Sequence, residues 1–178
     1  MLTLLQGPEI ALVSLEEAKN HLRLDHSYDD NYLLSLIQTA TDYVENYLCK
    51  SLISKKFRLV GTPQIRSDGL SYLKLPNFPI LEIISVKQLR EKSSQIIDRF
   101  CFDQKRAHPE ICVYGDGAPI EVIYKAGFGD KPIHVPTGIF QAVLIMTGEM
   151  YENRTAVPME NSNLIQALLA PYRFIRIR

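Results

Sequence analysis

The sequence has no excess of either charge, because 20 lysine and arginine residues balance 20 aspartate and glutamate residues. Proteins that grip nucleic-acid phosphates usually carry a basic surplus, so this balance argues against a general affinity for DNA or RNA. Long hydrophobic runs are also missing, and no stretch approaches a membrane-spanning helix. The opening segment MLTLLQGPEIALV lacks a basic start and is interrupted by Gly7-Pro8, which makes it a poor signal peptide. We therefore expect a soluble protein without a membrane partner, intracellular where it is made.

Cysteine is scarce in this chain. Only Cys49, Cys101 and Cys112 are present, an odd number at wide spacing, and no CxxC pair occurs. This pattern indicates neither a disulfide framework nor a zinc site. We expect each cysteine to be a small apolar residue, buried or half-buried, in a reducing compartment such as the cytoplasm.

Signatures of enzymes are missing as well. The nucleophile motif G-x-S-x-G and the phosphate-binding motifs G-x-x-x-x-G-K-[ST] and G-x-G-x-x-G are absent. A lone G-x-G lies in Ala126–Asp130, but Lys131-Pro132 follows where a helix would have to begin, so the segment indicates a turn. His108 and His134 lie close to prolines, and nothing local pairs them with a nucleophile. We therefore expect no catalytic residues, no metal and no cofactor.

What the sequence does contain begins with two predicted helices. Ser14 and Glu17 form a capping box, in which the serine oxygen accepts the Glu17 backbone N–H and the glutamate reaches back. An apolar stripe at helical spacing runs from Leu33 to Leu48, and Asp29 is placed to cap the start of this second helix. The first fifty residues are therefore predicted to be helical.

The joint between these helices gathers Asp25, His26, Asp29 and Asp30. These residues could ligate the metal ion of a hydrolase, but their spacing fits neither an H-E-x-x-H helix nor an EF-hand loop. Helix capping and solvated charge at a corner explain the same residues. We favour the corner, and a stoichiometric metal in the purified protein would support the hydrolase instead.

The middle of the chain, from about residue 53 to 130, has the pattern of a β unit. Short runs of branched and aromatic residues alternate there with turns rich in glycine, proline and aspartate. Gly115-Asp116-Gly117 predicts a hairpin between the last two strands. The predicted strands are residues 57–60, 72–75, 80–86, 96–102, 111–114 and 120–125.

The C-terminal part opens with another predicted helix at Pro136, and a short helix is expected near residues 161–169. The first of these is apolar on nearly every side, so its own core or a neighbouring subunit must cover it. Part of the contact between copies is expected from Val143, Met146, Met150 and Tyr151.

The segment Pro171–Arg178 is a C-terminal arm in which arginine alternates irregularly with apolar residues. One interpretation is a last strand on the protein's own sheet, and another is an arm that docks on a partner, for instance by adding a strand to it. A different class of function is nucleic-acid binding, although no basic aromatic face supports it elsewhere. That alternative would use Tyr172, Arg173, Arg176 and Arg178.

Together these patterns predict an α+β protein that forms a single domain over residues 1–178. A small helical bundle, made by residues 14–50 and 136–170, carries an inserted antiparallel β unit and ends in the arm of residues 171–178.

Several blocks of the sequence, taken in order, resemble the head–tail connector family of long-tailed phages, prophages and gene transfer agents. Each block is weak alone, but together they span nearly the whole chain in the family's order. They are Ser14–Lys19, His21–Asp25, Asp29-Asp30, Tyr43–Glu45, Leu48–Ser51, Tyr124–Gly129, Val135-Pro136, Gln141-Ala142, Tyr151–Arg154 and Leu168–Arg173.

The resemblance implies a structural adaptor that assembles in the bacterial cytoplasm and then lies in the neck of the particle. Its copies, about a dozen, would form a ring under the portal, extend the DNA channel and present a surface for the stopper or tail-completion protein. DNA would be only a passenger in the channel, which suits the zero net charge. The residues that would contact the portal are Tyr172, Arg173, Phe174, Ile175, Arg176, Ile177 and Arg178.

Overall fold

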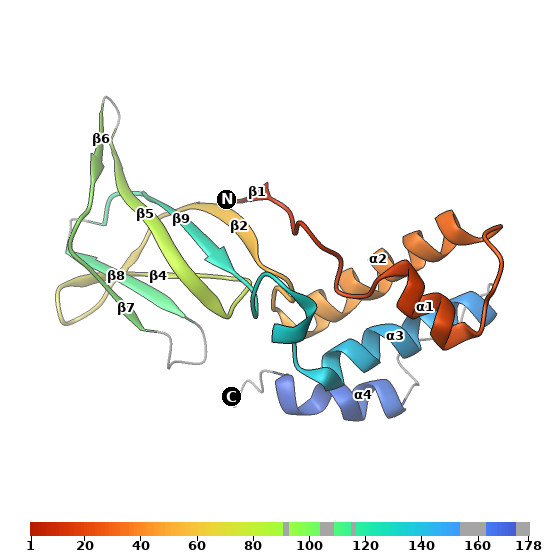
Figure 1. The fold of residues 1–178 in the computed structure, drawn as a ribbon. Helices are drawn as coiled ribbons and strands as arrows, with labels where there is room; N and C mark the ends of the chain where they lie inside the picture. Colours follow the sequence, from red (N-terminus) through yellow and green to blue (C-terminus); the bar gives the residue numbers. More distant parts are fainter. Residues whose placement is uncertain (91–92, 104–108, 115–116, 154–162, 174–178) are drawn as a thin grey trace. The chain divides into compact units, whose positions relative to one another are not determined.

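A computed structural model describes residues 1–90, 93–103, 109–114, 117–153 and 163–173. The chain divides into two compact units (Figure 1). The β unit consists of residues 1–8 and 54–129, and the helical unit consists of residues 9–53 and 130–178. The predicted α+β class, with a helical bundle and antiparallel strands, is confirmed. No helix in the described ranges is both long and apolar enough to cross a membrane.

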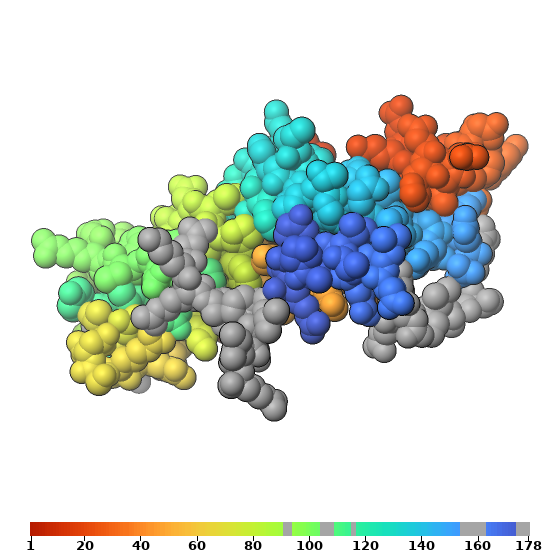
Figure 2. All heavy atoms as spheres, turned by 90° about the horizontal axis from the view of Figure 1, so that it is seen from below, coloured from red at the N-terminus to blue at the C-terminus, as the bar shows by residue number. Residues whose placement is uncertain are grey.

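The helical unit packs around α3 (Thr137–Glu152), which contacts α1 (Leu15–Leu22), α2 (Asp30–Leu48) and α4 (Asn163–Leu169). The contact between α3 and α4 is visible in Figure 2. Short 3-10 helices, η1 (Pro132–His134) and η3 (Ala170–Tyr172), flank these elements. The predicted stripe on α2 is buried, and each of its leucine, isoleucine and valine side chains contributes about 1.5–3 kcal/mol when fully covered. The buried residues of α2 are Leu33, Ile37, Ala40, Val44 and Leu48.

Helices α1 and α2 end in the same way, each on a residue with left-handed backbone. Arg23 has φ 55° and Cys49 has φ 54°. After α1, the Leu24 N–H donates to the Lys19 carbonyl, and after α2 the Lys50 N–H donates to the Glu45 carbonyl. These bonds satisfy carbonyls that would otherwise lack partners at the helix ends. Both helices therefore end without the glycine that usually takes the left-handed position.

The β unit contains two antiparallel sheets (Figure 1). The strand order of the first sheet is β1 (Leu2–Gln6), β2 (Lys55–Gly61), β9 (Ile120–Ala126), β5 (Ile80–Arg90) and β6 (Ser93–Ile96). The order of the second sheet is β3 (Gln64–Ile65), β4 (Leu70–Lys74), β8 (Glu110–Tyr114) and β7 (Phe100–Asp103).

Side chains from both sheets meet in one hydrophobic cluster. Phe57 and Tyr124 come from the first sheet, and Ile111 and Val113 come from the second. The Tyr124 hydroxyl donates a hydrogen bond of 2.9 Å to the Pro76 carbonyl, so this buried polar atom has a partner. Burial raises the pKa of Tyr124 far above its usual range, so its hydroxyl stays neutral. The inner faces of the two sheets therefore make the core of this unit.

Three expectations about the strands need correction. The first fifty residues are not all helical, because Leu2–Gln6 pairs with β2 as an added strand. The predicted strand at residues 96–102 is two strands, β6 and β7, and they lie in different sheets. The hairpin predicted at Gly115–Gly117 is wrong, because β8 pairs with β4 and β7 whereas β9 pairs with β2 and β5. Gly117, with φ +79°, lies where the chain passes from one sheet to the other.

Candidate functional site

The base of the C-terminal arm lies against the helical unit. Tyr172 contacts α3 at Gly138, where an added Cβ would lie 3.2 Å from Tyr172 Cε2 and 3.3 Å from its hydroxyl oxygen. The same Cβ would lie 3.4 Å from the Leu168 carbonyl oxygen. Any side chain at position 138 would therefore press on Tyr172. The glycine provides the space in which the tyrosine ring rests.

The next residue, Arg173, is held by aromatic rings of α2. Its guanidinium carbon lies 5.0 Å from the centroid of the Tyr47 ring. Tyr47 stacks in turn on Tyr43, with centroids 6.3 Å apart and an angle of 11° between the rings. The Arg173 N–H also donates to the Ala170 carbonyl at 3.3 Å. A cation over an exposed ring contributes about 0.5–1 kcal/mol, enough to favour one position for the start of the arm.

The structure thus brings two of the seven predicted portal-binding residues, Tyr172 and Arg173, onto the surface of α3 and α2. Sequence reasoning missed their anchors. Gly138 is an isolated glycine in an apolar helix, and Tyr43 and Tyr47 are one helical turn apart, a spacing that could have indicated a shared face. The other predicted residues, Phe174, Ile175, Arg176, Ile177 and Arg178, lie outside the described residues.

The four residues predicted to contact neighbouring copies lie on α3, and they differ in exposure. Val143 and Met146 are fully buried within the helical unit, so they offer no side-chain surface to another subunit. Met150 and Tyr151 are half-buried. The Tyr151 hydroxyl donates to Asp29 Oδ2 at 2.7 Å. Of the four residues predicted to contact another subunit, only Met150 and Tyr151 have side chains exposed enough to do so.

At the corner between α1 and α2, polar side chains cap the start of α1 and link α1 to α2. The Glu17 N–H donates to Ser14 Oγ at 3.2 Å, and the Ser14 N–H donates to Glu17 Oε2 at 2.7 Å, so the capping box is present. Lys19 Nζ and Asp30 Oδ1 form an ion pair of 2.8 Å between the helices.

Asp29 stands at the N-cap position of α2, but its side chain makes no capping hydrogen bond. Its carboxylate instead accepts the hydrogen bond from the Tyr151 hydroxyl of α3. Within the described ranges, no three His, Cys, Asp or Glu side chains gather as a metal site would require. The corner connects α1, α2 and α3.

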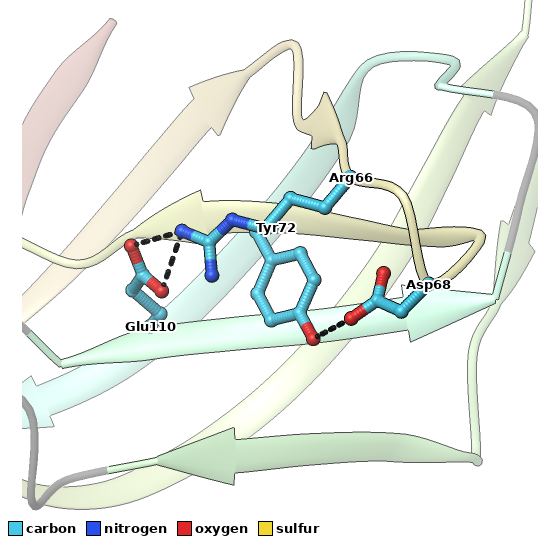
Figure 3. Close-up of polar contacts among 4 residues, drawn as sticks. All are labelled: Arg66, Asp68, Tyr72 and Glu110. Atoms are coloured by element: carbon cyan, nitrogen blue, oxygen red, sulfur yellow. Dashed lines mark hydrogen bonds and ion pairs between the residues drawn. The ribbon is translucent and has the colours of Figure 1, made fainter.

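A second polar cluster lies on the outer face of the second sheet (Figure 3). Arg66 Nη2 donates to both carboxylate oxygens of Glu110, at 2.8 and 2.9 Å, and the guanidinium lies 3.9 Å from the centroid of the Tyr72 ring. The Tyr72 hydroxyl donates to Asp68 Oδ2 at 2.6 Å. That hydrogen bond holds the pKa of Asp68 below its usual range and raises the pKa of Tyr72.

The same cluster fixes the turn between β3 and β4. The Leu70 N–H donates to Asp68 Oδ1 at 3.0 Å, and the Gly69 N–H donates to the Arg66 carbonyl at 3.0 Å. Gly69 has φ +78°, which a glycine adopts without strain. The sequence Ser67-Asp68-Gly69 predicts a turn, but it carries no signal for the ion pair with Glu110, which is distant in the chain.

Basic side chains of the β unit are thus partly neutralised. Arg66 is paired with Glu110, and Arg58 on β2 forms an ion pair with Glu121 on β9. Phosphate binding needs cations that are free to displace counterions. These two arginines therefore do not make a nucleic-acid surface.

Comparisons with known proteins agree with one another. Residues 12–89 match the family model described as phage gp6-like head-tail connector protein. This range covers α1, α2 and the strands from β2 to β5, except the last residue of β5, and it confirms the resemblance inferred from the sequence. The family is one of connector proteins and not of enzymes. No curated protein sequence matches the chain at a significant level.

Solved structures with the same fold come from gene transfer agent particles. A chain in the neck of the empty particle, computed with C6 symmetry, has 23% identity and a TM-score of 0.83. A chain in the virion of the native particle has 24% identity and a TM-score of 0.82. A chain in the native neck, computed with C12 symmetry, has 23% identity and a TM-score of 0.80. Each match covers 100% of this chain and 97% of the other.

Proposed function

We propose that this chain, which matches the head–tail connector family over residues 12–89, is a structural connector in the neck of a phage-like particle. The observation that carries the proposal is the agreement of two independent comparisons. The family match rests on sequence, and the likeness to neck proteins of gene transfer agents extends over the full chain. The chain acts by binding other proteins and not by catalysis.

The proposed assembly is a homo-oligomeric ring. Similar chains occur in necks that were computed with C6 and C12 symmetry, so identical copies surround an axis in those particles. In a cyclic ring each copy uses two different surfaces, one for each neighbour. We infer that Met150 and Tyr151, the half-buried end of α3, contribute to one of them. The ring extends the channel through which DNA leaves the particle.

The proposed partners along the axis are the portal on one side and the stopper or tail-completion protein on the other. We assign portal attachment to the C-terminal arm, residues 171–178. The support for this is that Tyr172 and Arg173 hold the start of the arm on the helical unit. Residues that are already ordered lose less entropy when a partner binds, so these two contacts favour binding at the arm. Assembly takes place in the host cytoplasm, and the finished ring lies in the particle neck.

Charge supports the passage of DNA through such a ring. The formal net charge is zero, and Arg58 and Arg66 are paired with carboxylates. A channel with many free cations would hold DNA by releasing its counterions, and would slow its exit. The pairing of these two arginines lowers the attraction of the β unit for DNA.

The test is a truncation that spares the anchors. Removing residues 174–178 keeps Tyr172 on Gly138 and Arg173 on Tyr47, so the thermal unfolding midpoint stays unchanged. Co-sedimentation with purified portal from the same particle is expected to fall at least tenfold, because the arm supplies the attachment. A matched control replaces Arg23, an exposed residue of the helical unit, with alanine. Undiminished portal binding by the truncated chain would remove the arm from this role.

A further inference from the structure

Two of the three cysteines are direct partners across a strand pair. Cys101 on β7 and Cys112 on β8 are opposite each other in the antiparallel register. Opposed residues point to the same face of a sheet, with Cα atoms about 4.5–5.5 Å apart. A disulfide spans Cα separations of about 4.4–6.8 Å, so this pair lies within reach of a bond. Both thiols are free, and they are hydrogen-bonded to each other.

The two thiols differ in their surroundings. Cys101 is exposed, whereas Cys112 is buried. Cys112 is also opposite Tyr72 on β4, so it lies next to the cluster of Arg66, Tyr72 and Asp68. Burial, together with the hydrogen bond to Cys101, raises the pKa of the Cys112 thiol to about 11. A reagent in solution therefore reaches Cys101 first, whereas the Cys112 thiol is shielded by burial and is mostly protonated near neutral pH.

From this geometry we propose that Cys101 and Cys112 form a reversible thiol–disulfide pair, which a small-molecule disulfide such as oxidised glutathione closes. In the first step, the Cys101 thiolate attacks one sulfur of the reagent and a glutathione thiolate leaves. In the second step, Cys112 gives its proton to the buffer base and its sulfur attacks Cys101 Sγ. The bond between Cys101 and glutathione breaks, and the second glutathione thiolate leaves. Two protein thiols are oxidised, and one glutathione disulfide is reduced to two thiols.

The Cys101–Cys112 disulfide would link the edge strand β7 covalently to β8, its neighbour in the sheet. β7 is at the end of the second sheet, and β8 is its neighbour there. Closing the loop from residue 101 to 112 restricts the unfolded chain and so stabilises the folded one. The time at which the disulfide forms rests on the proposed function, because a particle assembled in a reducing cell meets oxidising conditions only after its release. The thiol chemistry itself does not depend on that function, so the two can fail separately.

The experiment must distinguish cysteines that form a disulfide from cysteines that only fill space in the sheet. Small residues such as cysteine often fill a sheet without reacting, and exposed Cys49 of the helical unit would confuse a count of thiols. The experiment therefore uses the full chain with Cys49→Ser. It is incubated with oxidised glutathione in mildly alkaline buffer, and its intact mass, free thiols and unfolding midpoint are measured.

The expected product has lost two hydrogens, carries no glutathione, and yields a Cys101–Cys112 linked peptide after proteolysis. Its unfolding midpoint is expected to rise by about 5–10 °C, and dithiothreitol is expected to reverse the rise. Adding Cys112→Ser gives a control that keeps Cys101 and stops at the mixed disulfide. A stable glutathione adduct on Cys101 with Cys112 present would overturn the proposal. So would two free thiols after oxidation of the folded protein.

Discussion

The two units of this chain are held together in different ways. In the helical unit, α3 is covered on most sides by its neighbours, and its buried side chains, among them Ile139 and Met146, are mainly apolar. In the β unit, the inner faces form an apolar core, but charged and aromatic side chains link neighbouring strands on the outer faces. The helical unit, although it holds the Lys19–Asp30 ion pair, therefore depends mostly on shape and volume, and the β unit depends more on paired charges.

The largest effect is expected from removing volume in the helical unit. Met146 is fully buried on α3, so Met146→Ala leaves a cavity that the surrounding helices cannot fill. The free energy of unfolding is expected to fall by about 2–5 kcal/mol. Chemical denaturation followed by circular dichroism measures the change. Leu164→Ala, at an exposed position of α4, is the matched control and is expected to change stability by less than about 0.5 kcal/mol.

A smaller effect is expected from breaking the main ion pair of the β unit. Glu110→Gln removes the negative charge and one of the two oxygens that accept hydrogen bonds from Arg66, while the shape of the side chain is kept. Because Glu110 is buried and Arg66 is partly exposed, the expected loss is about 1–3 kcal/mol. The same measurement on Glu82→Gln, an exposed residue of β5, should show almost no change. Equal losses in the two variants would mean that the cluster in Figure 3 contributes nothing specific.

Alanine substitutions at two glycines of α3 distinguish an effect on helix stability from an effect on the position of the arm. Gly148→Ala places its methyl carbon 3.5 Å from His21 and Leu22, an ordinary contact, and is expected to stabilise the helix by about 0.5–1 kcal/mol. Gly138→Ala, in the first turn of the helix, gains less helix propensity and presses on Tyr172 at 3.2 Å. We expect it to weaken portal binding several-fold while Gly148→Ala leaves binding unchanged. If both variants bind the portal alike, Tyr172 does not position the arm.

The smallest effect is a dependence of stability on pH that comes from Asp68 and Tyr72. The pKa of Asp68 is lowered in the folded state, so its contribution is present above about pH 4 and is lost as pH falls through the folded value. The pKa of Tyr72 is raised, so its contribution is present below about pH 10 and is lost as pH rises through the folded value. Tyr72→Phe should flatten the stability curve at both ends. Curves of the same shape before and after the substitution would contradict this assignment.

The sequence was most informative where structure is local. The capping box of Ser14 and Glu17 and the stripe on α2 are set by residues a few positions apart, so their periodicity predicted them. The Gly-Asp-Gly segment failed as a hairpin signal because a turn does not specify which strands pair, and β8 and β9 find other partners. The pairing of Cys101 with Cys112 likewise follows only from the register of β7 and β8.

The candidate site was predicted in part. The alternating pattern of the arm identified Tyr172 and Arg173 as candidates. Their contacts with Gly138 and Tyr47 could not be predicted, because they join residues far apart in the chain. Apolar composition identified α3 as a covered helix, yet it could not tell a subunit contact from an internal core. Burial of Val143 and Met146 within the helical unit makes that distinction.

The most direct test of the connector assignment is electron microscopy of the purified chain mixed with the portal of its own particle, with light scattering on the same sample. The account predicts a ring of identical copies on one end of the portal, with cyclic symmetry like that of the similar necks. Portals without added density, in a sample where the chain remains monomeric, would contradict it.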